Sequence, residues 1–174
     1  MESPNNTIIF LIGFMGSGKT TWGRKLAQRT GWTFIDLDEQ ITTQIGQSIP
    51  AYFAQYGEAA FRELERTTLQ QLDLSSPTIV STGGGTPCFF NNMEWMNQHG
   101  KTVYLRLPAK TLWDRLTKSN ISSRPALHGL SGDQLLAHIQ TRLAEREPHY
   151  NNASYIVDQL SVSLDELAKL IKNS

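Results

Sequence analysis

Residues 8–20 of the chain read IIFLIGFMGSGKT, and this stretch predicts a strand, a glycine-rich loop and the start of a helix. Its first five residues are apolar and end at Gly13, as in a short buried strand. Residues 19–29 then show a helical pattern that stops at Gly31. Residues 13–20 match the pattern G-x-x-x-x-G-K-[ST], and they have the strand before and the helix after them that this pattern requires.

The glycines of this loop allow backbone N–H groups to turn inward toward phosphate oxygens. The N-terminus of the following helix adds the positive end of its dipole. We expect Lys19 to bridge the β- and γ-phosphates of a nucleoside triphosphate and the Thr20 hydroxyl to ligate Mg²⁺. The alternative is a glycine-rich turn that carries a lysine by chance. The predicted nucleotide contacts in this loop are Gly16, Ser17, Gly18, Lys19, Thr20 and Thr21.

Apolar segments alternate with helical patterns along the whole chain. Because the strand-like segments are apolar throughout, they predict a parallel sheet covered on both faces, an α/β fold. The chain has 174 residues with no repeat and no linker, so we predict a single domain over 1–174. The expected strands are 7–12, 33–37, 77–82, 101–107 and 154–157; the expected helices are 19–29, 49–56, 58–72, 91–99, 109–116, 134–147 and 163–172; residues 117–133 are expected to form a polar surface loop.

The composition excludes several classes of function. Sixteen Lys and Arg balance sixteen Asp and Glu, so the chain lacks the basic surplus of a general nucleic-acid binder. No apolar run approaches the ~20 residues that cross a bilayer, and residues 1–6 do not have the character of a secretory signal. Cys88 is the single cysteine, so no disulfide can form within the chain. We expect a cytoplasmic protein without nucleic-acid or membrane partners.

Asp36-Leu37-Asp38 follows the second predicted strand, at the strand end where parallel sheets bind ligands. On an extended segment, residues i and i+2 point the same way, so both carboxylates would face one cleft. One could support Mg²⁺ through water, and the other could accept a proton or a hydrogen bond from an acceptor hydroxyl. The alternative is that one of them only caps the helix that follows.

Arg62 lies on a predicted helix, with Glu58 and Glu65 at i−4 and i+3. That spacing is typical of a surface salt bridge, which is the alternative to a role in ligand binding. Gly83-Gly84-Gly85 follows a strand directly, and such a run permits a ligand to approach the backbone closely. It could also be a flexible connector.

Two further arginines have ordinary explanations beside functional ones. Arg124 lies in the polar loop, where arginines are usually solvated, although in a kinase it could close over a triphosphate. Arg146 comes two residues before Pro148, which is expected to end the helix. Its charge could therefore simply complement the helix dipole.

These stretches together resemble shikimate kinase, within the nucleoside monophosphate kinase-like group of phosphate-loop proteins. The resemblance runs from end to end of the chain. It implies a three-layer α/β/α fold with a five-stranded parallel sheet in the order 2-3-1-4-5, a substrate-binding region at about 38–72 and a lid at about 117–132. The resemblance is carried by residues 13–20, Asp36-Leu37-Asp38, Phe61-Arg62-Glu63-Leu64-Glu65, Gly83-Gly84-Gly85, Arg124-Pro125 and Arg146-Glu147-Pro148-His149-Tyr150.

The implied reaction is ATP-dependent phosphorylation of the 3-hydroxyl of shikimate, with Mg²⁺, on the way to chorismate and the aromatic amino acids. By resemblance, Arg62 and Arg146 would hold the substrate carboxylate, which suits their guanidinium forks. Asp38 would hold the substrate hydroxyls and could take the reacting proton. Backbone contacts to the ring substituents would come from Gly83, Gly84 and Gly85.

The resemblance also assigns the nucleotide side of the site. Thr20 and, through water, Asp36 would serve Mg²⁺. Lys19 and Arg124 would balance charge on the transferring phosphoryl group, so that Lys19, Asp38 and Arg124 would be the catalytic residues. Arg115 would stack on the adenine.

Two other functions remain open from the sequence. One is a kinase of the same architecture for another small acceptor, such as gluconate or a nucleoside monophosphate. The other is a catalytically silent nucleotide-binding module, which would be expected to lose Lys19, Asp38 or Arg124; all three are present. We expect a monomer whose partners are the small molecules ATP and shikimate.

Overall fold

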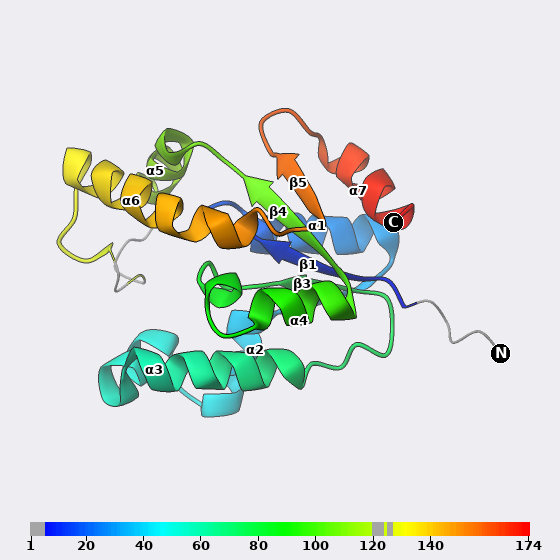
Figure 1. Ribbon diagram of the computed structural model, residues 1–174, viewed down its shortest axis with the longest axis horizontal. Coiled ribbons are helices and arrows are strands. Elements are labelled where there is room, and N and C mark those ends of the chain that lie inside the picture. The colour runs from blue at the N-terminus through cyan, green and yellow to red at the C-terminus, as the bar shows by residue number, and fades with distance from the viewer. Residues whose placement is uncertain (1–5, 120–123, 125–126) are drawn as a thin grey trace.

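The computed structural model describes residues 6–119, 124 and 127–174, and it forms three layers with a parallel sheet in the middle (Figure 1). The sheet has five strands in the order β2-β3-β1-β4-β5, and every neighbouring pair is parallel. This confirms the expected fold and strand order. The strands are β1 (Ile8–Ile12), β2 (Thr33–Asp36), β3 (Thr78–Ser81), β4 (Lys101–Arg106) and β5 (Tyr155–Asp158).

Helices connect the strands and cover both faces of the sheet (Figure 1). In the described part of the chain, no helix is both long and apolar enough to span a bilayer. The helices are α1 (Lys19–Thr30), α2 (Leu37–Ile45), α3 (Ile49–Gln70), the 3₁₀ helix η1 (Thr86–Cys88), α4 (Asn92–His99), α5 (Ala109–Thr117), α6 (Gly132–Tyr150) and α7 (Leu164–Lys172).

The central strand β1 shows why its sequence is apolar throughout. Its alternate side chains enter two separate clusters, and all five residues are buried. Ile9 and Leu11 pack with α1 and α7 on one face. Ile8, Phe10 and Ile12 pack on the other face with side chains of α2, α3, α4, α5 and α6. A strand covered on both sides has no polar face, which is the pattern of a parallel sheet.

Two predictions of helix ends have different outcomes. The two helices expected over 49–56 and 58–72 run together as α3, but Gly57 lies between them with φ 84° and ψ 173°. Glycine adopts this left-handed backbone freely, so the break is where the sequence placed it.

The prediction that Pro148 ends its helix is wrong, because α6 continues to Tyr150. The helical i to i−4 hydrogen bonds continue beyond the proline, since the N–H of Asn151 donates to the carbonyl of Glu147 at 2.8 Å. Tyr150 is fully buried in the core, and this burial helps to hold the last turn in helical form.

Candidate functional site

The loops that follow β1 and β3 and the start of α2 line one large cavity of about 1030 Å³. These loops leave the carboxyl ends of parallel strands, where ligands of such sheets bind. The volume suits a nucleotide together with a small second ligand. The residues of the predicted site that line this cavity are Gly16, Gly18, Lys19, Thr20, Thr21, Asp38, Arg62, Gly83, Gly84, Gly85, Arg115, Arg124 and Arg146.

The loop between β1 and α1 has the backbone of a phosphate-binding nest. Gly16 and Gly18 have positive φ values of 79° and 87°, which other residues adopt only with strain. Gly18 is also the N-cap of α1, so the first turn of that helix presents its N–H groups to the cavity. Ser17 is fully buried and turns its carbonyl away to accept hydrogen bonds from Arg115 Nη1 at 3.2 Å and Gln159 Nε2 at 2.6 Å.

Lys19 is buried at the centre of this loop, with only 7% of its surface exposed. Its Nζ donates to the carbonyls of Gly13 at 2.8 Å and Phe14 at 3.0 Å, so the loop holds the ammonium group in place. Burial lowers the pKa of Lys19 to about 8; the positive charges of Arg146 and Arg124 act in the same direction, against Asp38. A nearby anion would relieve both the desolvation and the repulsion.

Asp36 serves two partners at once. Its Oδ2 accepts a hydrogen bond from Thr20 Oγ1 at 2.7 Å, and its Oδ1 accepts one from the N–H of Glu39 at 3.2 Å. Asp36 is therefore the N-cap of α2 and also a neighbour of the phosphate loop. The Oγ of Ser81, at the end of β3, lies 3.4 Å from Thr20 Oγ1. The capping and metal-binding interpretations of this aspartate are compatible.

The predicted geometry of Asp38 is wrong, although its place at the cavity is confirmed. The extended segment ends at Asp36 and α2 begins at Leu37, so Asp38 lies in the first turn of a helix. Asp38 is solvent-exposed where the cavity opens, yet the surrounding protein removes enough water to raise its pKa to about 6. The negative charges of Asp36 and Glu65 raise it further, against Lys19 and Arg62. A carboxyl group tuned in this way is suited to accept a proton.

Arg62 is not the surface ion pair that its spacing suggests. Its side chain is 11% exposed, and its Nη1 donates to Glu65 Oε1 at 2.9 Å, where Glu65 itself is 1% exposed. The exposed partner, Glu58, is more distant at 3.4 Å. The guanidinium carbon also lies 4.1 Å from the centre of the Phe89 ring. Arg62 is thus held firmly at the cavity wall rather than free in solvent.

Glu65 links this arginine to the triple glycine. Its Oε2 accepts a hydrogen bond from Thr86 Oγ1 at 2.8 Å, and Thr86 Oγ1 accepts one from the N–H of Gly83 at 3.0 Å. A methyl group added to Gly85 would lie 2.7 Å from Arg62 Nη2. A side chain at Gly85 would therefore force Arg62 to move, and this close packing argues against a flexible connector.

Arg146 lies against the neighbouring residue of the same glycine turn, Gly84. A methyl group added to Gly84 would lie 3.4 Å from Arg146 Nη1 and 3.1 Å from the N–H nitrogen of Met15 in the phosphate loop. That Nη1 is buried, and it has no hydrogen-bond partner among the residues that the structure describes. Nor does Arg146 form an ion pair within that part of the chain. Two arginines thus flank one turn, and only Arg62 has a carboxylate partner.

The remaining predicted residues lie on the rim of the cavity. Arg115, on α5, is exposed and bonds to Ser17 as described. Arg124 is half-buried, and this burial lowers its pKa. The lid expected over 117–132 lies partly outside the described residues, which include neither 120–123 nor 125–126; within the described part, Leu127 is fully buried in the core.

Several residues that support the site through hydrogen bonds could not be identified from the sequence. Thr86 was unassigned, and the buried hydroxyl of Tyr150, which donates to the carbonyl of Gly84, was matched only as part of a motif. Gln159, which holds the Ser17 carbonyl, was missed entirely. For Glu65 the i+3 spacing from Arg62 indicated a pair but not its burial. No local pattern indicated the contacts of Tyr150 and Gln159, since these contacts join segments 66 and 142 residues apart.

Comparison with known proteins identifies the family. A sequence model described as Shikimate kinase matches residues 15–173. A shikimate kinase of Parabacteroides distasonis is 45% identical over 150 residues, which cover 86% of each chain. One of Bacteroides fragilis is 42% identical over 171 residues, which cover 94% of this chain and 95% of the relative.

Solved structures agree with these relatives. The crystal structure of shikimate kinase from Bacteroides thetaiotaomicron superposes with a TM-score of 0.88 at 39% identity and covers 95% of this chain and 98% of its own. Shikimate kinase from Acinetobacter baumannii in complex with shikimate gives a TM-score of 0.85 at 32% identity, with 97% and 92% covered. Since the sequence model, the relatives and the solved structures coincide over almost the entire length, the chain belongs to the shikimate kinase family.

Proposed function

We propose that this protein transfers the γ-phosphoryl group of ATP to the 3-hydroxyl of shikimate, giving shikimate 3-phosphate and ADP. The observation that carries the proposal is the pair of arginines at the glycine turn. Arg146 has a buried guanidinium nitrogen without a partner, and it lies in one cavity with Arg62 and the phosphate loop. A cavity that joins a triphosphate site to a carboxylate site fits a small acidic acceptor.

The acceptor half of the site is proposed to work through charge and backbone contacts. Arg146 and Arg62 hold the carboxylate from two sides, which desolvates it and fixes its direction. Gly83, Gly84 and Gly85 allow the ring of the acceptor to approach the turn without meeting side chains. The Glu65 ion pair keeps Arg62 in the orientation that this requires.

The nucleotide half is proposed to hold ATP with Mg²⁺. The Thr20 and Asp36 oxygens, 2.7 Å apart, are a small set of hard donors of the type that Mg²⁺ accepts when phosphate oxygens and waters complete its shell. Thr20 would bind the ion directly and Asp36 through water. When bound, the ion neutralises charge on the β- and γ-phosphates. The adenine would lie near Arg115, on the rim of the cavity.

The proposed chemical step is an in-line displacement. The oxygen of the 3-hydroxyl forms a bond to the γ-phosphorus as the bond to the β,γ-bridging oxygen breaks, and ADP leaves. Asp38 accepts the hydroxyl proton, for which a pKa raised to about 6 is suitable. Lys19 and Arg124 stabilise the charge on the transferring group and on the leaving oxygen.

A panel of acceptors tests this proposal. ADP release from ATP would be followed with shikimate, gluconate and AMP, and the product identified by ³¹P NMR. We expect turnover with shikimate and little with the other two, because AMP has no carboxylate and gluconate has no ring to fill the glycine turn. Turnover with AMP or gluconate but not with shikimate would refute the substrate; no turnover with any acceptor would favour a silent module.

We also propose that the protein acts as a monomer in the cytoplasm, with residues 38–72 as its acceptor-binding region. This chain itself supplies the phosphate loop, the glycine turn and both arginines on which the proposed reaction depends. The single thiol, Cys88, needs no oxidising compartment. Sedimentation analysis of the purified protein checks the monomer, and a dimer that persists at nanomolar concentration would contradict it.

A further inference from the structure

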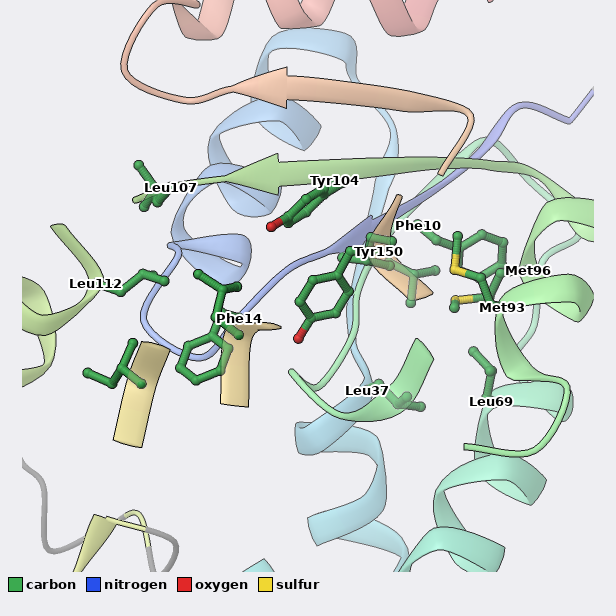
Figure 2. Close-up of a cluster of buried hydrophobic side chains, with 14 of the residues drawn as sticks. Phe10, Phe14, Leu37, Leu69, Met93, Met96, Tyr104, Leu107, Leu112 and Tyr150 are labelled. Atoms are coloured by element: carbon green, nitrogen blue, oxygen red, sulfur yellow. The ribbon is translucent and has the colours of Figure 1, made fainter. Parts of the chain in front are cut away.

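Tyr150 lies at the end of α6, two residues beyond Pro148, and it is fully buried. Its ring packs against Tyr104, with centroids 4.9 Å apart and planes at 39°. Figure 2 shows the two tyrosines side by side in the cluster, with their hydroxyl groups pointing in different directions. The hydroxyl of Tyr150 donates to the carbonyl of Gly84 at 2.5 Å, whereas that of Tyr104 has only a 3.4 Å contact with Glu147.

The contact with Gly84 has a consequence for the next residue. In a trans peptide the carbonyl and the N–H point in opposite directions, and the described chain contains no cis peptide bond. The carbonyl of Gly84 and the N–H of Gly85 belong to one peptide. When Tyr150 draws that carbonyl toward the core, the N–H of Gly85 turns the other way, toward the cavity that both glycines line.

This peptide needs an external support. A bond between two glycines has no side chains to restrict its rotation, so it can turn over easily in isolation. Within the described part of the chain, the N–H groups of Gly84 and Gly85 have no hydrogen-bond acceptor. An N–H directed at a cavity without an acceptor is available to a ligand.

Arg146 lies one helical turn before Tyr150, at i and i+4 on the same face of α6. Both side chains reach the same glycine: Arg146 Nη1 lies 3.4 Å from the position of a methyl group on Gly84, and Tyr150 bonds to its carbonyl. Burial raises the pKa of Tyr150 above its usual range, so the phenol keeps its proton and remains a donor. The last turn of α6 therefore supplies one charged group, Arg146, and one backbone contact, through Tyr150, at this wall.

We propose that Tyr150 is a positioning residue for the acceptor: it fixes the Gly84–Gly85 peptide so that the N–H of Gly85 donates to an oxygen of the bound substrate. The inference rests on the proposed function for the identity of that substrate. It also gives a reason for the helix to continue past Pro148, since a helix that ended there would not bring Tyr150 to the turn.

Tyr150→Phe tests the role, and Tyr104→Phe is the matched control. Both remove one hydroxyl from adjacent buried rings, but only the first releases the glycine carbonyl. We expect Tyr150→Phe to raise KM for shikimate about 5- to 10-fold, the effect of one lost hydrogen bond, with KM for ATP unchanged. Shikimate affinity by titration calorimetry should fall by the same factor. Tyr104→Phe should alter neither constant.

Three results would overturn the inference: an unchanged KM for shikimate in Tyr150→Phe, an equal rise in both KM values, or the same shift in Tyr104→Phe. Melting temperatures of both variants show whether the fold is damaged. If Tyr150→Phe does not fold, the wild-type protein labelled with ¹⁵N-glycine decides, because shikimate must then shift the Gly85 amide signal; an unshifted signal refutes the role. Failure of the proposed function would appear separately, as absent shikimate turnover by the wild type.

Discussion

Replacing Arg146 by alanine should leave stability nearly unchanged and replacing Arg62 should lower it, although both changes should impair shikimate use to a similar extent. Arg146 has one buried guanidinium nitrogen without a hydrogen-bond partner, and an unsatisfied buried donor costs the folded state free energy. Its removal also loses the packing of the side chain over Phe14, 5.4 Å from the ring centre. Because these effects oppose each other, we expect Arg146→Ala to change the free energy of unfolding by less than about 1 kcal/mol.

Arg62→Ala should behave differently, because it leaves the Glu65 carboxylate buried at 1% exposure. Breaking a buried pair by removing one partner costs about 3–5 kcal/mol of folding free energy. Thr86 still donates to Glu65, which places the expected loss toward the lower end of that range.

The two variants should lose a similar amount of kcat/KM for shikimate. Each removes one charged partner from a desolvated carboxylate, which should cost about 2–4 kcal/mol in kcat/KM. The affinity for ATP should stay nearly unchanged, since neither arginine belongs to the phosphate loop. The double variant should lose less than the sum of the single losses, because both guanidinium groups act on one ligand.

Saturation curves for shikimate and ATP measure the losses in kcat/KM, the affinity for ATP and the additivity of the two substitutions, and melting temperatures measure stability. Arg66→Ala is the control: it lies one turn after Arg62 on α3, does not line the cavity, is 37% exposed and pairs with Glu63 at 2.9 Å, so its loss should change neither stability nor kinetics appreciably. Strict additivity, equal losses for ATP and shikimate, or equal destabilisation by the two single variants would refute the assignment.

Three other changes follow from the same geometry. Lys19→Met should lower kcat at least about 100-fold without lowering the melting temperature, since its charge is buried at a cost and acts on the transferring group; a folded variant with normal kcat would exclude that role. The kcat/KM for shikimate should fall on the acid side of the pH profile, because Asp38, with its pKa raised to about 6, takes up a proton there and ceases to be a base. The kcat/KM for ATP should fall above about pH 8, where Lys19 loses its proton. Flat profiles between pH 5 and 9 would contradict both expectations. Gly85→Ala should raise KM for shikimate but not for ATP, because its methyl group would displace the Arg62 guanidinium 2.7 Å away; equal rises would mean a general distortion.

The sheet could be predicted from the sequence because each strand has a recognisable local sequence pattern. β1 is five consecutive buried residues bounded by Gly13, and the phosphate loop follows at a fixed spacing. The order of the strands came from the family resemblance and not from these patterns. Gly57 shows the same local logic, since a glycine between two helical patterns marks the one position in α3 with a left-handed backbone.

The errors arose where tertiary contacts outweigh local preference. Pro148 disfavours a helix locally, but the burial of Tyr150 keeps α6 continuous. Asp38 was expected on an extended segment, and no helix was expected over 37–45; α2 begins at Leu37 because Asp36 caps it through the N–H of Glu39. The spacing of Arg62 and Glu65 is identical in exposed and buried helices, so the sequence could not reveal that this pair is enclosed.

The charge balance of the chain also conceals the property on which the proposed function depends. Six cationic and four carboxylate side chains line the cavity, and three of the carboxylates are taken up in ion pairs with two of the arginines. Among the described residues, Lys19, Arg115, Arg124 and Arg146 have no ion pair, and Asp38 is the one cavity carboxylate left to oppose them. A neutral total predicts no polyanion-binding surface, but it averages over a cavity with a local positive excess. Burial is the main reason that the pKa of Lys19 is lowered, and the charges of Arg146 and Arg124 add to this effect. A triphosphate and a carboxylate bound together would neutralise the local positive excess.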